Sequence, residues 1–335
     1  MASELDGEVV FLAPRGSTRM ISPDYKTIPI LSQPLLGGGI GRKLIFSLCA
    51  LPSLLQSLCV VARERPGVIL GTGGYASVAP LLAAWFLGID IAVQEQNVVP
   101  GLATRALAMV ANRVFISYEE TAKWLPKERL VIAGNPVRRT IGEPTREDGA
   151  AYLGLEPGIP TVLFLGGSRG ARSINRALTE VLKILPAKER IQFIAVMGEN
   201  DASELRAISD SLPQKIVLFE FMSQIEYAYS ACDLVVSRAG ATTISELLIC
   251  GKPSILIPYP YAGGHQEFNA LLLRKNGAAV IIEDSALTGL RLKEEIFSIL
   301  HSAARRQRMA QRAQSLAKRG AARRIAEELR RCSDT

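Results

Sequence analysis

The sequence predicts an α/β protein made of two similar halves, each built from alternating strands and helices. Short apolar, β-branched runs alternate with amphipathic segments, and Gly-bearing turns follow several of these runs. The length of 335 residues also exceeds that of one ordinary hydrophobic core. This alternation is typical of parallel sheets covered by helices. We therefore expect two Rossmann-like domains that face a cleft, with a nucleotide-linked substrate as its ligand.

The predicted domain boundaries follow changes in composition. Residues 139–159 are polar and rich in Gly and Pro, which indicates a link between domains. We expect an N-terminal domain over 1–138, a C-terminal domain over 160–310 and a basic C-terminal helix over 311–335. Strands are predicted in the first half at 8–13, 27–31, 68–70, 89–93, 114–117 and 130–133. Strands are predicted in the second half at 161–165, 191–196, 215–219, 234–236 and 254–257.

Composition excludes several classes of protein. With 48% hydrophobic and 21% charged residues, the chain is globular and not disordered. The longest apolar run, 44–61, is interrupted by Pro52 and Gln56, which makes it a poor membrane span. The five cysteines have no metal-binding spacing, and there are only two histidines. We expect reduced thiols in a cytosolic protein and no metal centre.

The positive charge is concentrated at the end of the chain. Residues 301–335 contain ten Lys or Arg residues against three acidic ones, and so carry the whole formal net charge of +7. Basic helices of this kind either face anionic lipid or nucleic acid, or pack on the protein body with a solvated basic face. No aromatic residue interrupts the basic run, which argues against binding single-stranded nucleic acid by stacking.

One stretch, 233–260, organises the rest of the prediction. It contains a β-branched strand, a turn at Gly240, an amphipathic helix that ends at Gly251, and a second strand after Pro253. A helix that begins directly after a strand points free N–H groups at the carboxyl edge of the sheet. Glu246 lies about one turn inside and could bind vicinal hydroxyls. The alternative is a capping box formed by Thr243 and Glu246.

Other candidate residues also follow predicted strands. Glu95, Gln96 and Asn97 end one strand, where polar residues face a ligand crevice. Arg138 offers a forked donor suited to phosphate. Further candidates lie in Gly-rich turns or in a loop: Gly73, Gly74 and Tyr75 after 68–70, Ser168 in the turn 166–171, and His265 and Gln266 on a loop after Gly264. The Gly-rich segment 37–43 lacks a P-loop ending and is interpreted as a loop that could touch lipid headgroups.

Taken in order, these motifs resemble the MurG family, the N-acetylglucosaminyltransferases that convert lipid I to lipid II in peptidoglycan synthesis. The similar segments are 71–77, 95–97, 134–138, 166–171, 237–246 and 265–270. The resemblance implies a GT-B fold and an inverting transfer from UDP-N-acetylglucosamine to the muramyl 4-hydroxyl of undecaprenyl-linked lipid I. It also implies no cofactor or metal, no nucleic-acid partner, and peripheral attachment to an anionic lipid surface at the cytoplasmic face of the bacterial membrane.

The resemblance also implies roles for individual residues. Ser168 would hold a donor phosphate near Arg138, and the backbone of Met222 would read the uracil edge. Glu246 would bind the ribose hydroxyls, and Gln266 with His265 would bind the sugar ring, which Asn97 would contact across the cleft. The remaining donor candidates are Ala241, Thr242, Thr243, Ile244 and Ser245, and candidates for the acceptor side are Gly73, Gly74, Tyr75, Glu95 and Gln96.

One departure from the family concerns the start of the chain. The family opens with a strand, a Gly-rich turn that ends in His, and a helix, whereas this sequence begins near the end of that helix, at 2–5. The missing strand would leave unpaired neighbours in the first sheet. The catalytic base is therefore not identified. We expect that the natural start lies upstream; the alternatives are a donor-binding remnant without activity, or a related transferase acting on diacylglycerol.

Overall fold

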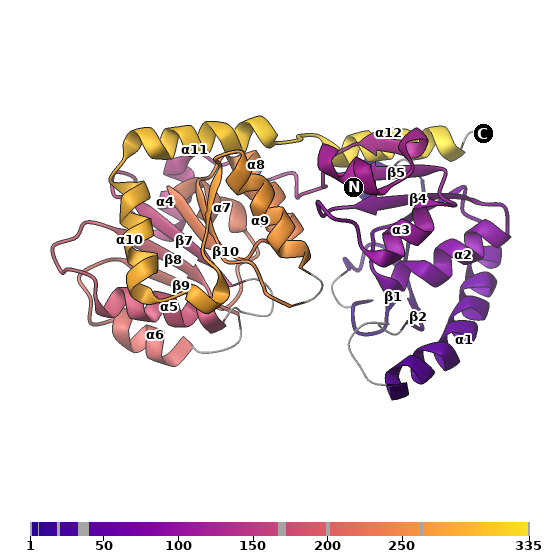
Figure 1. The fold of residues 1–335 in the computed structure, drawn as a ribbon, viewed down its shortest axis with the longest axis horizontal. Helices are drawn as coiled ribbons and strands as arrows, with labels where there is room; N and C mark the ends of the chain where they lie inside the picture. The colour runs from indigo at the N-terminus through magenta and orange to yellow at the C-terminus, as the bar shows by residue number, and fades with distance from the viewer. Residues whose placement is uncertain are drawn as a thin grey trace. The chain divides into compact units, whose positions relative to one another are not determined.

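The computed structural model describes residues 2–5, 7–18, 21–32, 40–166, 172–198, 202–261 and 264–333. The chain divides into two compact units (Figure 1). Unit 1 contains residues 1–136 and 320–335, and unit 2 contains 137–319. Both units have parallel sheets with helices, so the predicted α/β class is confirmed. The candidate Ser168 and residues 37–39 of the Gly-rich segment 37–43 lie outside the described residues, and the rest of that segment belongs to the first helix.

Unit 2 is a doubly wound parallel sheet with the order β12-β11-β10-β7-β8-β9. Its first strand, β7, is central and all five of its residues are buried, as is typical of a strand covered on both faces. Later strands are added outward on either side of it. The strands are β7 (Thr161–Leu165), β8 (Gln192–Val196), β9 (Ile216–Phe219), β10 (Leu234–Ser237), β11 (Ser254–Leu256) and β12 (Ala279–Ile281). All but β12 were expected from the sequence.

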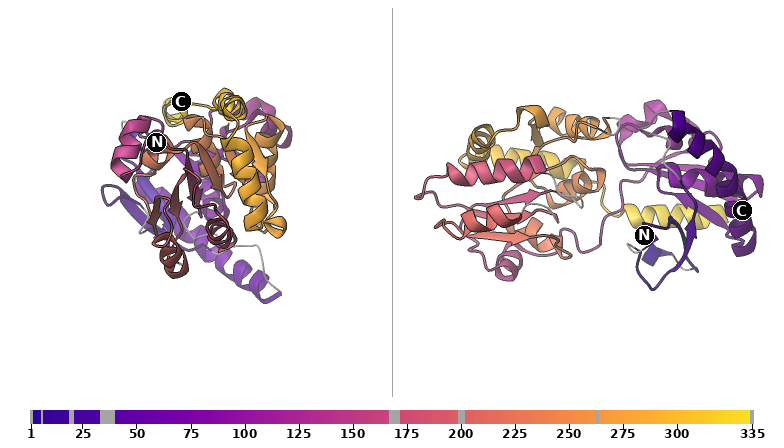
Figure 2. Two further views of the ribbon diagram at one scale, coloured as in Figure 1. Left: turned by 90° about the vertical axis from the view of Figure 1, so that its left-hand side faces the viewer. Right: turned by 90° about the horizontal axis from the view of Figure 1, so that it is seen from below.

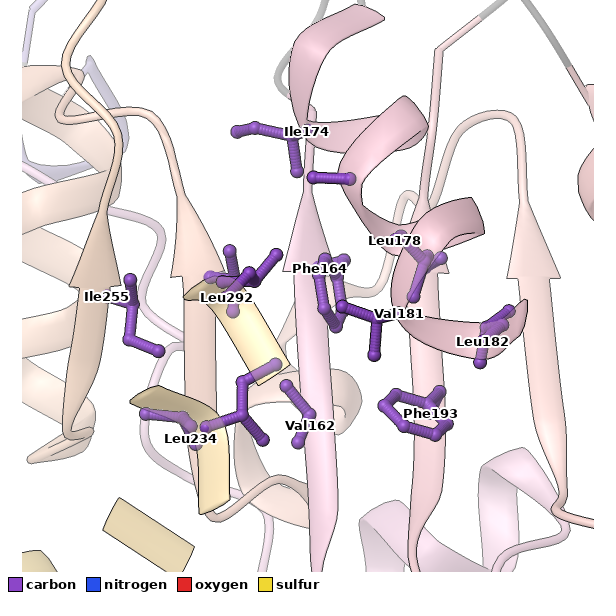
Figure 3. Close-up of a cluster of buried hydrophobic side chains, with 14 of the residues drawn as sticks. Val162, Phe164, Ile174, Leu178, Val181, Leu182, Phe193, Leu234, Ile255 and Leu292 are labelled. Carbon is purple, nitrogen blue, oxygen red and sulfur yellow. The ribbon is translucent and has the colours of Figure 1, made fainter. Parts of the chain in front are cut away.

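The main core of unit 2 lies on one face of this sheet (Figure 3). Val162 and Phe164 of β7 pack there with apolar residues of helices α5 (Arg172–Lys183) and α10 (Gly289–Leu300). Leu163 alternates with them and points to the other face, where α7 contacts β7. The other helices are α4 (Arg146–Leu153), α6 (Ala202–Ser209), α7 (Ile225–Ala231), α8 (Ala241–Cys250), α9 (His265–Lys275) and α11 (Ala303–Leu316), with a 3₁₀ turn, η6, at Asp284–Ala286.

Residues 139–159, which we predicted as a link, contain helix α4 and belong to unit 2. A capping box formed by Thr145 and Asp148 starts the helix, and Gly154 ends it in the left-handed conformation. The helix packs on α7, because Gly149 has no side chain to collide with the backbone of that helix. Composition hid this helix because its capping residues are those that also favour turns.

Unit 1 has two separate parallel sheets within the described residues. Strands β1 (Val10–Pro14) and β2 (Lys26–Ile30) pair only with each other, and neither pairs with the sheet β3-β4-β5-β6. The four strands of the larger sheet are β3 (Val68–Gly71), β4 (Asp90–Glu95), β5 (Arg113–Ile116) and β6 (Leu130–Ile132).

Helices cover both faces of the larger sheet of unit 1. Helices α1 (Ile40–Glu64), α2 (Val78–Phe86) and α3 (Leu102–Ala108) bury one face, with Val93 and Val114 in the shared core. The remaining elements are 3₁₀ turns: η1 (Ala2–Glu4), η3 (Tyr75–Ser77), η4 (Glu119–Trp124) and η5 (Lys127–Arg129). Among the described residues, no helix is both long enough and apolar enough to span a membrane.

The end of the chain returns to unit 1 as helix α12 (Ala321–Ser333), which lies along β3 and β4 (Figure 1 and Figure 2). Ile325 and Leu329 are buried with Phe115 of β5, and Arg324 donates to the carbonyl oxygens of Ile132 and Ala133. The segment predicted as one basic helix thus contains two, α11 and α12, in different units. The second has a buried apolar face, as in the packed-helix alternative.

Candidate functional site

The strand order locates a candidate ligand site in unit 2. The sheet grows in opposite directions from the adjacent strands β7 and β10, so the segments that follow them diverge. Crevices of this kind at the carboxyl ends of parallel strands bind ligands in doubly wound folds. One predicted donor-binding segment lies here: helix α8, which begins four residues after Ser237.

The amino end of α8 is not capped by a side chain. Its N-cap is Gly240, and the first N–H groups of the helix are directed toward the carboxyl edge of the sheet. The alternative capping box of Thr243 and Glu246 is wrong, because the helix begins at Ala241 and Thr243 is already inside it. Gly251 has the predicted left-handed conformation and ends the helix. The free end of α8 is thus suited to bind an anionic or hydroxyl-rich ligand.

Glu246 lies in the second turn of α8, where it is partly buried. The hydroxyl of Tyr229 on α7 donates to Glu246 Oε2 at 2.8 Å. Burial raises the pKa of Glu246, and the nearby carboxylate of Glu226 adds to this, while the Tyr229 bond and the charge of Arg138 oppose it. Burial and the Glu246 charge in turn raise the pKa of Tyr229 well above its usual value. The phenol therefore stays protonated and holds one carboxylate oxygen.

Arg138 lies beside the segment that leads from β9 into α7. It donates to the carbonyl oxygen of Ser223, next to Met222, and its Nη2 lies 4.0 Å from Oε2 of Glu226. Glu226 is only 7% exposed, and its Oε2 has no hydrogen-bond partner among the described residues. The structure thus brings Arg138, Met222 and Glu246, three predicted donor-site residues, to one region of unit 2.

The other predicted residues of α8 differ in what they offer a ligand. The side chains of Ile244 and Ser245 are buried, and the Ser245 hydroxyl donates to the carbonyl oxygen of Ala241. Thr242 is exposed and Thr243 is partly exposed. A ligand at this helix end therefore has access to the backbone and to the two threonines, and the side chains of Ile244 and Ser245 serve packing.

The prediction that His265 and Gln266 lie on a loop is wrong. Both belong to the first turn of α9, whose N-cap Gly264 has φ of 72°, a conformation that glycine adopts without strain. Gln266 Oε1 accepts from the backbone N–H of Tyr259 at 3.0 Å. Asn269, which is fully buried, donates to the carbonyl oxygen of Ala239 at 3.2 Å and so ties α9 to the start of α8 (Figure 1).

The candidates in unit 1 form their own cluster at the carboxyl end of β4. Glu95 is 2% exposed, and its carboxylate accepts from the backbone and side-chain amide of Asn97 at 3.0 Å and from Gly101 N–H at 3.2 Å. Glu95 therefore orders the loop that presents Asn97. A side chain at Gly73 would approach the amide of Gln96 at 3.6 Å. Gly73 and Gly74 have positive φ, and Tyr75 is 43% exposed.

Sequence reasoning missed three residues of the unit 2 site: Tyr229, Glu226 and Arg238. Arg238 directly follows β10 and its side chain is only 15% exposed. A charged residue at the end of a buried strand is the signal that identified Glu95, so Arg238 could have been found. Tyr229 and Glu226 gave no such signal, because they occupy an ordinary helix. No cluster of three His, Cys, Asp or Glu residues suited to a metal occurs within the ranges that the structure describes.

Comparison with known proteins agrees with this geometry. Residues 4–116 match the model of the glycosyltransferase family 28 N-terminal domain, and residues 161–327 match that of its C-terminal domain. A UDP-N-acetylglucosamine–N-acetylmuramyl-(pentapeptide) pyrophosphoryl-undecaprenol N-acetylglucosamine transferase of Thermodesulfovibrio yellowstonii is 38% identical over 301 residues, covering 88% of this chain and 82% of that protein. The Myxococcus xanthus protein of the same name is 36% identical, covering 96% and 84%.

A solved structure is similar to this chain over most of its length. The crystal structure of Acinetobacter baumannii MurG matches with a TM-score of 0.76 and 27% identity, covering 97% of this chain and 91% of that one. The chain has the GT-B fold, two Rossmann-like domains with parallel sheets. It belongs to the MurG family of UDP-N-acetylglucosamine–N-acetylmuramyl-(pentapeptide) pyrophosphoryl-undecaprenol N-acetylglucosamine transferases.

Proposed function

We propose that this protein transfers N-acetylglucosamine from UDP-N-acetylglucosamine to the muramyl 4-hydroxyl of lipid I, undecaprenyl-diphospho-N-acetylmuramyl-pentapeptide, and so makes lipid II. The relatives named above carry this reaction in their names and align with most of the chain. The single observation that carries the proposal within the structure is the uncapped end of α8 with Glu246 beside it, at the switch point of a parallel sheet.

The donor is a diphosphate with a ribose and a sugar, and unit 2 offers a complementary group for each part. The N–H groups at the start of α8 attract negative charge, and Arg138 adds a forked cation. Glu246 binds the ribose hydroxyls through the carboxylate oxygen that Tyr229 leaves free. The backbone beside Met222 reads the uracil, and His265 and Gln266, at the start of α9, bind the N-acetylglucosamine ring.

The reaction forms a bond between the acceptor oxygen and C1 of N-acetylglucosamine and breaks the bond from C1 to the β-phosphate of UDP. Inversion requires the acceptor hydroxyl to attack from the face opposite the leaving UDP, with its proton passing to a base. The positive groups of unit 2 stabilise the charge that develops on the leaving diphosphate. In unit 1, Glu95 holds Asn97, which we propose as a further sugar contact. UDP-N-acetylglucosamine is the donor substrate, and the proposal involves no separate cofactor.

The purified chain tests this function directly. It is incubated with UDP-N-acetylglucosamine and with either lipid I or diacylglycerol in detergent micelles, and the lipid products are separated. We expect a disaccharide product from lipid I alone. Glycosylation of diacylglycerol alone would overturn the proposal in favour of a related lipid glycosyltransferase. Donor binding without any product would instead identify a donor-binding protein.

We also propose that the protein attaches to the cytoplasmic face of the bacterial membrane through unit 1. Helices α1 and α2 pack against each other and carry large exposed apolar residues. Leu51 and Leu55 are 63% and 53% exposed, and Trp85 and Phe86 are 49% and 61% exposed. Exposed apolar residues in such numbers are typical of interaction sites, and aromatic side chains suit a membrane interface. The proposed partner is an anionic lipid surface.

Sedimentation with vesicles of phosphatidylglycerol and phosphatidylethanolamine tests this attachment. Leu51→Ser together with Phe86→Ser should reduce the bound fraction without changing turnover of a soluble lipid I analogue. The control is Leu290→Ser in unit 2, where the leucine is 57% exposed and similar in size. Equal binding of the control and the double variant would contradict attachment through α1 and α2.

A further inference from the structure

Arg238 makes contacts with several separate segments at the carboxyl edge of the unit 2 sheet. Its Nη1 donates to Asp284 Oδ1 at 2.6 Å and to the carbonyl oxygens of Ile257 at 3.1 Å and Pro258 at 3.4 Å. Its Nη2 donates to Ser173 Oγ at 2.8 Å, and Ser173 Oγ in turn donates to Asp284 Oδ1 at 2.7 Å. The guanidinium also lies 5.5 Å from the ring centre of Tyr259.

These contacts connect four neighbouring strands of the sheet. Arg238 follows β10, and Ser173 lies in the first turn of the helix that follows β7. Ile257 and Pro258 follow β11, and Asp284 lies in the 3₁₀ turn η6, after β12. The strands occur in the order β12-β11-β10-β7, so one guanidinium joins the ends of β10, β11 and β12 to the end of β7, across the switch point.

Each connected segment adjoins the start of a helix at the carboxyl edge of the sheet. Ser173 fixes the start of α5, the helix that follows β7. Arg238 itself precedes the free end of α8 by three residues. The Ile257–Pro258 segment leads to Tyr259, whose N–H holds Gln266. The relative positions of the starts of α5, α8 and α9 thus depend on one side chain.

We propose that Arg238 is a positioning residue for donor binding: together with Asp284, it holds the starts of α5, α8 and α9 in register without contacting the donor. This inference rests on the proposed function and adds a role that the motif resemblance does not assign. The planar guanidinium is suited to this role because it donates in several fixed directions at once. An ammonium keeps the charge but cannot reproduce that geometry.

The electrostatics of Asp284 fit this role. Partial burial tends to raise the pKa of Asp284, but hydrogen bonds from Ser173 and Arg238 and the Arg238 charge outweigh it and lower that pKa. The carboxylate is therefore charged at neutral pH and anchors the guanidinium. The pair is mostly buried, with side chains 15% and 26% exposed, so solvent screens it little.

The experiment compares Arg238→Lys and Asp284→Asn with a matched control, Arg146→Lys. Arg146 forms a similar pair with Asp233, with a contact of 2.8 Å and side chains 30% and 20% exposed, but at the amino end of β10, away from the donor segments. For each protein, the KM for UDP-N-acetylglucosamine, the KM for lipid I, kcat and the melting temperature are measured, and donor binding is measured by calorimetry.

We expect Arg238→Lys and Asp284→Asn to raise the donor KM and Kd by about tenfold, as for the loss of one charged hydrogen bond, with the acceptor KM unchanged. Their effects should not add in the double variant, because both break one network. The control should lower the melting temperature and leave the donor KM unchanged. A merely structural role would lower the melting temperature of all three without moving the donor KM.

Two failures are distinguishable. If the unaltered protein binds no UDP-N-acetylglucosamine, the proposed function fails and this inference fails with it. If the unaltered protein binds the donor but Arg238→Lys and Asp284→Asn bind it equally well, only the inference is overturned. If Arg238→Lys does not fold, Asp284→Asn tests the inference, because asparagine retains the shape of the aspartate side chain.

Discussion

The hydroxyl of Tyr229 on α7 donates to Oε2 of Glu246 on α8 across a distance of 2.8 Å. Tyr229 is fully buried, so the phenol cannot swing into solvent and the hydrogen bond fixes the carboxylate. One oxygen of Glu246 is thus held by the protein, and the other is the one that we propose for donor binding. A preoriented acceptor binds more tightly than a mobile one because no side-chain entropy is lost on binding.

Tyr229→Phe should therefore weaken donor binding by about 1 kcal/mol, the net contribution of one hydrogen bond. The ring still fills its buried site, so the fold should persist. The measurement is calorimetric titration with UDP-N-acetylglucosamine. Tyr227→Phe is the matched control, because Tyr227 lies two residues away on the same helix and stacks on Tyr152 instead. Equal donor affinities of both variants and the unaltered protein would show that Tyr229 does not contribute to donor binding.

Glu246→Ala should weaken donor binding by about 1–3 kcal/mol, as expected when charged hydrogen bonds are lost in a partly buried site. Glu246→Gln should weaken binding as well but should not destabilise the fold at neutral pH. Because the pKa of Glu246 is raised in the folded state, stability is lost as the pH rises from the ordinary glutamate pKa through the raised one. The amide removes this penalty. A lower melting temperature for Glu246→Gln at neutral pH would contradict this electrostatic account.

Donor affinity should depend on pH through Glu246. Burial raises its pKa and Glu226 adds to this, while Tyr229 and Arg138 act in the opposite sense; the net direction is upward. Acidification therefore protonates Glu246 at a higher pH than an ordinary glutamate, and the carboxylate that we propose for ribose binding is lost. We expect the donor Kd to rise as the pH falls through this range. In Glu246→Gln the donor Kd should not change over that pH range. A similar rise of the Kd in this variant would show that another group causes the pH dependence.

The strands of unit 2 could be predicted because nearly every residue in them is apolar and the intervening turns contain Gly. Thr161–Leu165 was expected to the residue. The carboxyl edge of the sheet follows from such a pattern, since parallel strands share their direction. The candidate site could thus be proposed from Glu246 and the turn before Ala241 alone. The family motifs added the identity of the ligand.

The details that tune the site could not be predicted. The contact between Tyr229 and Glu246 joins helices α7 and α8, which are separated along the chain by strand β10. Helical periodicity predicts only that Tyr229 is buried. The sequence predicts a loop at His265 because Gly264 suggests a turn. In the structure Gly264 is the N-cap of α9 and has a positive φ. Helix α12 packs on unit 1 because Ile325 and Leu329 find an apolar surface there, a tertiary effect without local signal.

The described cysteines should differ strongly in reactivity. Burial raises the pKa of Cys232 to about 11 and that of Cys250 to about 12, so neither thiol ionises near neutral pH. Cys59 on α1 is exposed. Because the thiolate is the nucleophile, iodoacetamide at pH 7.5 (about one unit below the ordinary thiol pKa) should label Cys59 and leave Cys232 and Cys250 unmodified until the protein unfolds. Peptide mass spectrometry with and without urea measures this, and early labelling of Cys232 would show that β10 opens in the native state.

Asp233→Asn should destabilise unit 2 by about 2–3 kcal/mol, because a charged bidentate pair is lost in a mostly buried place. Asp233 accepts from both Nη atoms of Arg146 at 2.8 Å and from the N–H of Thr161 at 2.9 Å, and so joins α4 to the start of two central strands.

The comparison is Glu220→Gln, which breaks the pair with Arg206 at 3.0 Å, where both side chains are more than half exposed. Water screens that pair, so its loss should cost less than about 1 kcal/mol. Urea unfolding of both variants measures how much unfolding free energy each loses. Equal losses would show that burial does not determine what an ion pair contributes to stability.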